Sequence, residues 1–204
     1  MESYKSADFE TIGAHGHWIV WVKDDIVIKQ LKNQNNKGLL YKNVQTFSLI
    51  KDVVKTTSFL EICLFDGTPA LMTERLINFV SPNSVDPDLH KTKLLCQIEG
   101  GEPPMECKLE QQYFKSKIGP ILNEEEFLQQ AKQDMLLLAE KRVQPYGDSY
   151  FFKVSETDYD IDYIIADWDN IDMESHLSID EIYGINEQCF HDEYDRFKYY
   201  FARV

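Results

Sequence analysis

The stretch between Lys153 and Arg196 most constrains this chain, because it contains fourteen Asp and Glu residues and no Lys or Arg. Aromatic and aliphatic residues interleave with these acids, so a fold must bury the apolar side chains while the carboxylates stay in contact with water or with cations. Residues 148–204 carry 15 acids and 4 bases, whereas residues 1–147 carry 20 and 17. The block predicts a solvated acidic face, a divalent-cation site or a docking surface for a basic partner.

Composition places the chain among folded acidic proteins. Its 204 residues are 43% hydrophobic and 13% aromatic, with a net charge of −14, which is enough apolar material for a core. Such a charge repels phosphate, so we expect no direct nucleic-acid partner and no membrane partner. The absence of a long apolar run and of a signal-peptide pattern predicts a cytoplasmic protein. The four cysteines are scattered without a C-x-x-C pair, as is typical of reduced thiols.

Hydrophobic periodicity predicts a β-rich first part. Residues 17–22 and 26–31 are expected to form a hairpin, and apolar residues at helical spacing predict a helix over 43–55. Residues 59–65 read as a strand, the Asp-Gly pair after them as a tight turn, and residues 70–80 as the partner strand. We expect this part to form a β-rich half over residues 1–80.

Proline and glycine clusters mark residues 81–120 as a linker or insertion, and residues 121–204 as a third segment. The third segment begins with the strongest helix pattern in the chain, over 124–142, with Asn123 as the expected N-cap and Glu126 completing a capping box. Residues 150–154 and 162–168 are expected to form two strands around an acidic turn. A short helix is expected near 178–189.

Five short motifs follow one another along this order of elements. Residues 13–16 (GAHG) form a sparse glycine loop, 27–29 (VIK) end in Lys, and 70–76 (ALMTERL) form a strand. Residues 146–148 (YGD) follow the long helix, and 164–169 (IIADWD) lie at the end of the second hairpin. In this order they resemble the protein-kinase-like fold, in particular small-molecule phosphotransferases of the aminoglycoside and lipopolysaccharide kinase type.

The resemblance implies an α+β, kinase-like two-lobed arrangement, with an antiparallel-sheet N-lobe followed by a reduced helical C-lobe. It implies ATP and Mg²⁺ as cofactors, with a catalytic Asp that orients the acceptor hydroxyl. The residues that match are the catalytic Asp148, the nucleotide-binding Lys29, Gly13, Gly16 and Glu74, and the metal-binding Asp167 and Asp169.

Three positions depart from the family pattern. Tyr146 stands where the catalytic loop has His, and Lys153 stands where the family has a metal-binding Asn. Asp52 is the sole acid available in the predicted helix to pair with Lys29. These departures leave two interpretations open: a reduced ATP- and Mg-dependent phosphotransferase, or a pseudokinase.

The acidic block supports an alternative function of another class. An acidic binding or inhibitor protein, of the immunity or anti-defence type, mimics nucleic acid or covers the basic surface of a partner, and electrostatic steering speeds its association. The interface would use Asp158, Asp160, Asp162 and Trp168. The three aspartates share a face if they lie on a strand, and are solvated if they lie in the turn between two strands.

Overall fold

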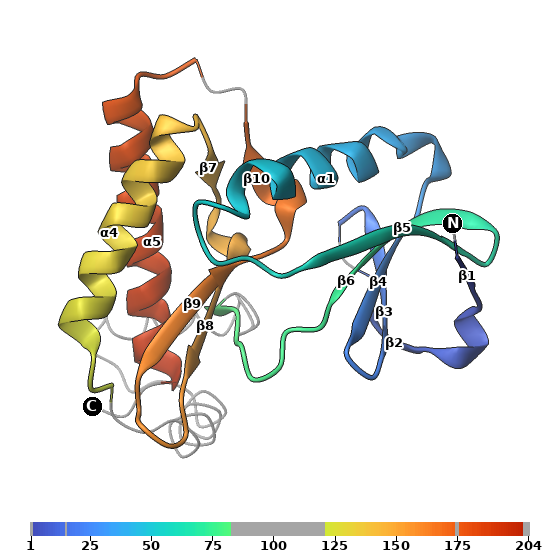
Figure 1. The fold of residues 1–204 in the computed structure, drawn as a ribbon, viewed down its shortest axis with the longest axis horizontal. Helices are drawn as coiled ribbons and strands as arrows, with labels where there is room; N and C mark the ends of the chain where they lie inside the picture. Colours follow the sequence, from blue (N-terminus) through green and yellow to red (C-terminus); the bar gives the residue numbers. More distant parts are fainter. Residues whose placement is uncertain (1, 15, 83–120, 174–175, 202–204) are drawn as a thin grey trace, which may run out of the picture. The chain divides into compact units, whose positions relative to one another are not determined.

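The computed structural model describes residues 2–14, 16–82, 121–173 and 176–201 (Figure 1). The fold is α+β, and the chain divides into two compact units, Met1–Asn78 and Phe79–Val204. Most of the expected linker, residues 83–120, lies outside the described residues. Within the described ranges, no helix is both long enough and apolar enough to cross a membrane.

The first unit is built on a six-stranded sheet in the order β1-β5-β6-β4-β3-β2. Neighbouring strands pair antiparallel, except that β1 lies parallel to β5 at one edge. The expected hairpin forms as β3 and β4, and the strand expected over 59–65 forms as β5. The strands are β1 Ser3–Tyr4, β2 Glu10–Gly13, β3 Trp18–Lys23, β4 Ile26–Leu31, β5 Phe59–Phe65 and β6 Thr68–Glu74.

A tight turn joins β5 to β6 and sets their register. Asp66 and Gly67 both have positive φ, 47° and 78°, the backbone that two-residue hairpin turns require and that Gly and Asp tolerate. The strand expected over 70–80 is shorter than predicted, because β6 ends at Glu74. The sheet buries a cluster of Ile28, Cys63, Phe65, Ala70 and Met72.

Helix α1, Gly38–Ile50, lies earlier in the chain than the predicted helix over 43–55. The prediction followed apolar residues at helical spacing, but two polar side chains, Asn43 and Thr46, are fully buried on this helix. The Asn43 amide donates to the carbonyl of Leu39 at 2.8 Å, so a local hydrogen bond compensates the buried donor. Because these polar residues lie on the buried face, the spacing of apolar residues alone misplaced the helix.

The second unit packs two helices side by side along a β-hairpin, as Figure 1 shows. The elements are α4 Glu124–Glu140, β7 Gln144–Pro145, β8 Tyr150–Val154, β9 Ile161–Ile165, β10 Ile171–Asp172 and α5 Ile179–Phe201. Strands β8 and β9 pair with each other, and β7 pairs with β10. Aromatic rings from both helices and the hairpin form the core: Phe127, Tyr150, Phe152, Tyr163, Phe190, Tyr194 and Phe197.

Helix α5 is continuous over 23 residues, so the prediction of a short helix near 178–189 was wrong in length. Its buried face combines Ile182 and Phe190 with two polar residues, Asn186 and Glu193. The Asn186 amide donates to the Val143 carbonyl at 3.0 Å. As in α1, buried polar residues interrupt the apolar stripe from which a helix is recognised.

Asn123 stands at the predicted N-cap position of α4, but its side chain makes no capping hydrogen bond. Its side-chain oxygen accepts from the Ile161 backbone N–H at 2.7 Å, and its amide donates to the Ile161 carbonyl at 3.1 Å. The predicted capping residue therefore joins the start of α4 to the start of β9. Glu124 accepts from Lys198 at 2.7 Å and Tyr194 at 3.0 Å, which ties the same helix end to α5 and lowers the pKa of the Glu124 carboxyl.

A buried hydrogen bond between Asp134 and Tyr163 joins α4 to β9. The Tyr163 hydroxyl donates to Asp134 Oδ2 at 2.7 Å, and the neighbouring oxygen accepts from Gln130 at 2.8 Å. We expect Tyr163→Phe to lower the free energy of unfolding by about 1–3 kcal/mol, because a buried carboxylate loses a donor.

Denaturant unfolding measures this change, and Tyr183→Phe is the matched control. The Tyr183 hydroxyl donates to Glu187 on the same helix at 2.8 Å, and the side chain is partly exposed. Its loss should change stability by less than about 0.5 kcal/mol. Equal losses of stability in the two variants would contradict the larger contribution expected from the buried Asp134–Tyr163 hydrogen bond.

Candidate functional site

Two loops of the second unit bring Asp148 and Asp167 together. Asp148 lies in a single turn of 3-10 helix, Gly147–Ser149, between β7 and β8, and Asp167 follows β9. Backbone hydrogen bonds join the loops: Ala166 N–H donates to the Ser149 carbonyl at 2.9 Å, and Tyr146 N–H donates to the Asn170 carbonyl at 3.1 Å. The β8 and β9 pairing on one side and the β7 and β10 pairing on the other hold both loops in register.

Asn170 links the two aspartates through one nitrogen atom. Its side-chain amide lies 2.8 Å from Asp148 Oδ2 and 3.3 Å from Asp167 Oδ2. Both carboxylates therefore face a common point, although they stand 19 positions apart in the sequence. Sequence reasoning missed Asn170, and the signal that it offered was its place three residues after Asp167 in the run DWDN.

Asp167 has a left-handed backbone, with φ 61° and ψ 57°. A non-glycine residue in this region costs on the order of 1 kcal/mol, and such residues cluster at functional sites. The flanking Trp168 is buried at 1% exposure, and the Asn170 N–H donates to the Asp167 carbonyl at 3.0 Å. The buried ring and the loop hydrogen bonds thus hold the strained residue and aim its carboxylate toward Asp148.

The site provides few carboxylate ligands for a hard cation such as Mg²⁺. Asp169 is half-buried in the turn of 3-10 helix that also contains Trp168 and Asn170. No three His, Cys, Asp or Glu side chains gather into a metal-binding group anywhere in the part of the chain that the structure describes. Lys153, at the expected position of a second metal-binding Asn, lies with its ammonium 5.7 Å from the centre of the Phe79 ring.

A buried carboxylate from α5 supports the Asp148 loop. Glu193 is 5% exposed and accepts from the Arg196 guanidinium at 2.9 Å. A Cβ atom on Gly147 would lie 2.5 Å from Glu193 Oε1, so the carboxylate occupies the space that any larger residue would need. Burial raises the pKa of the Glu193 carboxyl, Arg196 opposes that rise, and Asp148 and Asp192 add to it.

The predicted nucleotide-binding residues lie in the first unit. Lys29 is half-buried on β4, between Val20 of β3 and Leu71 of β6. Gly13 ends β2 at an irregularity of register, and Gly16 lies in a turn with φ 48° and open space where a Cβ would stand. Glu74 ends β6 and accepts from the Ser58 hydroxyl at 2.8 Å.

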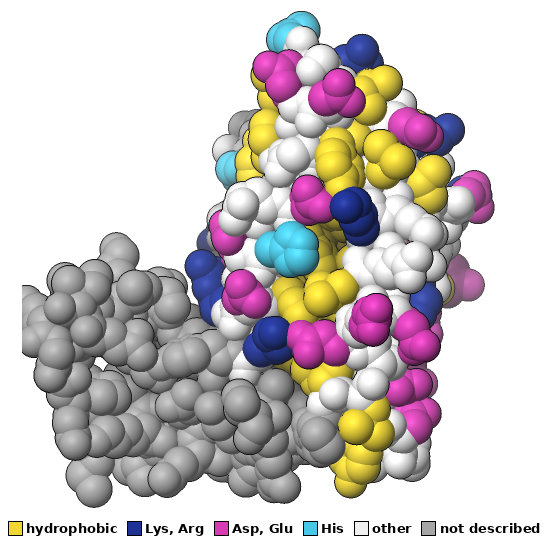
Figure 2. Space-filling view, turned by 90° about the vertical axis from the view of Figure 1, so that its left-hand side faces the viewer, with side chains coloured by type: hydrophobic (Ala, Val, Ile, Leu, Met, Phe, Trp, Pro, Cys, Tyr) yellow, Lys and Arg dark blue, Asp and Glu magenta, His cyan; other side chains and the backbone are white. Residues whose placement is uncertain are grey.

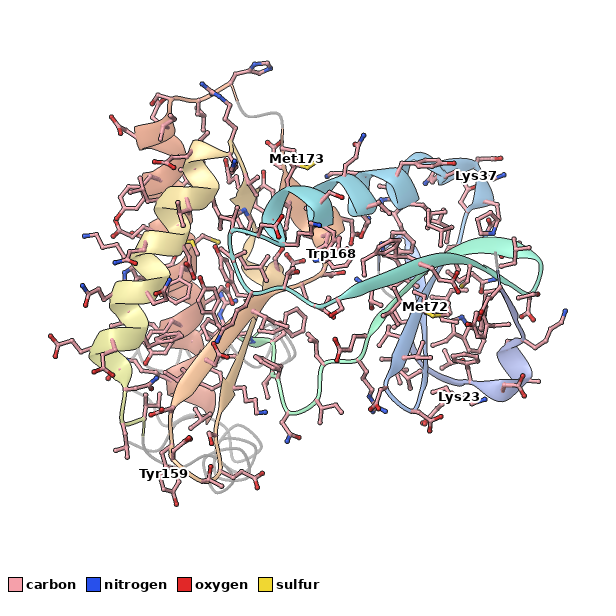
Figure 3. All side chains as sticks on the ribbon, in the orientation of Figure 1. Lys23, Lys37, Met72, Tyr159, Trp168 and Met173 are labelled. Atoms are coloured by element: carbon pink, nitrogen blue, oxygen red, sulfur yellow. The ribbon has the colours of Figure 1, made fainter. Side chains whose placement is uncertain are left out.

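The proposed partner-binding residues divide between surface and core. Asp158 and Asp160 are exposed in the turn between β8 and β9, beside Tyr159, which lies at the tip of the hairpin in Figure 3. Asp158 and Asp160 therefore lie in the turn and not on a strand. Asp162 is half-buried on β9, whereas Trp168 is buried and offers no surface to a partner.

Comparison with protein-family models and with curated proteins finds no match to this chain.

Steric contact between Gly147 and Glu193 predicts a double-mutant effect. Gly147→Ala should lower the free energy of unfolding by about 1–3 kcal/mol, since the new methyl group displaces a buried, hydrogen-bonded carboxylate. In a Glu193→Ala background the same substitution should cost less, because the space has been vacated. Denaturant unfolding of the four proteins gives the coupling, and additive effects would contradict the contact.

The raised pKa of Glu193 predicts a pH-dependent effect of Glu193→Gln. A carboxyl whose pKa is raised on folding contributes stability below its ordinary value of 4.5, and this contribution is lost as the pH rises through the folded-state value. The Tm of the variant should therefore improve relative to that of the original protein as the pH rises from 4.5 toward neutral. Thermal unfolding across this range is the measurement, and parallel Tm curves would contradict the burial effect.

Proposed function

We propose that this chain is a kinase-like protein that binds ATP with Mg²⁺ and acts as a reduced phosphotransferase. The observation that carries the proposal is the convergence of Asp148 and Asp167 on the Asn170 amide. Phosphoryl transfer depends on positioning and on electrostatic stabilisation more than on a reactive side chain. Two aspartates held at a fixed separation by paired loops fit that requirement.

The order of elements in each unit supports the same proposal. In the first unit an antiparallel sheet carries Lys29 on β4, and α1 follows that strand before β5 and β6. In the second unit α4 precedes the Asp148 loop, and the β8 and β9 hairpin leads into Asp167. This is the sequence of elements that the kinase resemblance implies, with α4 and α5 forming a reduced helical part.

Each residue has a role that its chemistry allows. Asp148 is exposed and would accept the hydrogen bond of an acceptor hydroxyl. Asp167 would hold Mg²⁺, which binds through one or two carboxylates together with substrate phosphates and so needs no larger cluster of ligands. Lys29 would contribute positive charge toward the nucleotide phosphates. The Asn170 amide donates to both carboxylates and orients them.

Nucleotide binding is tested by thermal unfolding with ATP and Mg²⁺. A ligand at about 100 times its Kd adds roughly 2.7 kcal/mol of apparent stability, so the Tm should rise by several degrees. Lys29→Ala and Asp167→Asn should each remove this rise. The matched controls Lys37→Ala, at the start of α1 (Figure 3), and Asp160→Asn, in the exposed turn, should keep it. No rise at millimolar ATP would overturn the proposal.

Phosphotransfer is tested separately from binding by following the hydrolysis of ATP or the transfer of its γ-phosphoryl group to small hydroxyl acceptors. Asp148→Asn should abolish turnover while the thermal shift remains, because the residue is assigned to the acceptor and not to the nucleotide. A thermal shift without turnover in the original protein would identify a pseudokinase.

A second candidate function is an acidic binding protein. The exposed carboxylates of Asp158 and Asp160, on either side of the exposed Tyr159, favour this function. Association with a basic partner through this turn would weaken steeply with salt and on charge reversal of the two aspartates.

A further inference from the structure

The outer face of α5 contains a groove that the nucleotide proposal does not use. It has a volume of about 540 Å³ and runs from Leu177, just before the helix, to Asp192. Figure 2 views the side of the unit on which α4 and α5 lie and shows hydrophobic side chains at its surface among charged ones. All the described residues that line the groove belong to one helix and the segment leading into it, and these lie within the second unit.

Gly184 lies in the groove, in the middle of α5. Glycine inside a helix costs about 1 kcal/mol relative to alanine. Its φ is ordinary, and a Cβ atom there would meet nothing within 4 Å. Neither backbone geometry nor packing within the described structure requires glycine here. Its effect is to leave a hollow on the exposed face of the helix.

Apolar side chains lie on this face of the helix and are exposed to water. Leu177 is 36% exposed and Ile185 39% exposed, and both line the groove. Single exposed apolar residues are common, but a groove that gathers them beside a hollow offers area that a partner can bury.

Among the residues that the structure describes, every charged side chain that lines the groove is acidic: Asp180, Glu181 and Asp192. Glu181 caps the helix by accepting from the Ser178 hydroxyl and N–H, at 2.7 and 2.9 Å. Asp192 accepts from Gln188 at 2.7 Å, and Asp180 lies in the first turn of α5. An apolar hollow rimmed by carboxylates complements a surface with apolar anchors and flanking Lys or Arg.

We propose that this groove binds a basic amphipathic helix of a partner protein. From Asp180 to Asp192 the groove follows about three helical turns, or about 18 Å, which matches anchors at i, i+3 or i+4, and i+7 of an amphipathic helix. A second copy of this chain is a poor occupant, because its net charge is −14 and like charges repel. The proposal does not depend on nucleotide binding.

The test uses a fluorescent synthetic peptide of Leu and Lys patterned as an amphipathic helix, with a scrambled peptide of identical composition as control. Fluorescence anisotropy should show saturable binding of the patterned peptide that weakens as salt increases. Gly184→Phe, which fills the hollow, should weaken binding about tenfold or more. Gly184→Ala should bind nearly as well as the original protein and should raise the Tm.

Charge reversal separates the groove from general acidity. The pair Asp180→Lys and Asp192→Lys should weaken binding about tenfold or more. The pair Glu125→Lys and Glu156→Lys makes the same change in net charge at exposed positions outside the groove and should have little effect. Equal losses from the two pairs would reduce the binding to non-specific attraction and overturn the proposal.

Cys189 provides a readout that does not depend on substitution. Its half-buried thiol lines the groove, and burial together with nearby Glu193, Asp192 and Asp148 raises its pKa to about 11. Bound peptide should slow alkylation at Cys189, followed by mass spectrometry of the fragment that contains it. Unchanged alkylation under saturating peptide, or equal binding of the scrambled peptide, would also overturn the proposal.

Discussion

The aromatic core of the second unit is the constraint on which its candidate site depends. Phe127 of α4 and Phe190 of α5 both pack against Tyr163 of β9, with ring centres 5.8 and 5.1 Å away. Burial of large rings supplies most of the stabilisation in such a core. Because the hairpin is held from both helices, the loops before β8 and after β9 keep one relative position, and their two aspartates meet.

Buried polar groups add specificity to that core and explain several differences from the predicted elements. Asp134 pairs with Tyr163, and Glu193 pairs with Arg196 and packs against Gly147. A buried carboxylate destabilises a fold unless donors satisfy it. The Asp134 pair therefore favours one position of α4 against β9, and the contact of Glu193 with Gly147 favours one position of α5 against the Asp148 loop. Buried polar residues interrupt the apolar stripes of two helices, Asn43 and Thr46 on α1 and Asn186 and Glu193 on α5, which is why periodicity misjudged the position of α1 and the length of α5.

The acidic residues of the candidate site could be predicted from the sequence, but the hydrogen bonds and contacts that join its segments could not. Asp148 and Asp167 were expected from the kinase resemblance, which matches them to a catalytic position after the long helix and a metal-binding position after the second hairpin strand. Asn170, Glu193 and Gly147 act through contacts between segments far apart in the chain. Asn170 offers one local signal, its place three residues after Asp167, and nothing in the local sequence of Glu193 or Gly147 marks their contact. The groove on α5 was equally invisible, since an exposed glycine and an exposed isoleucine have meaning only once the opposite face of the helix is known to be buried.

The sequence by itself determined the strands β3, β4, β5 and β8, the Asp-Gly turn and most of α4, because these depend on local alternation, turn chemistry and end charges. It also determined the acidic character of the last third of the chain. Only the tertiary structure decided which polar residues are buried, that the side chain of Asn123 at the start of α4 bonds to β9, and that Asn170 joins two aspartates. These outcomes arise from hydrogen bonds and packing between distant segments, whose energies do not exist until the chain has brought those segments together.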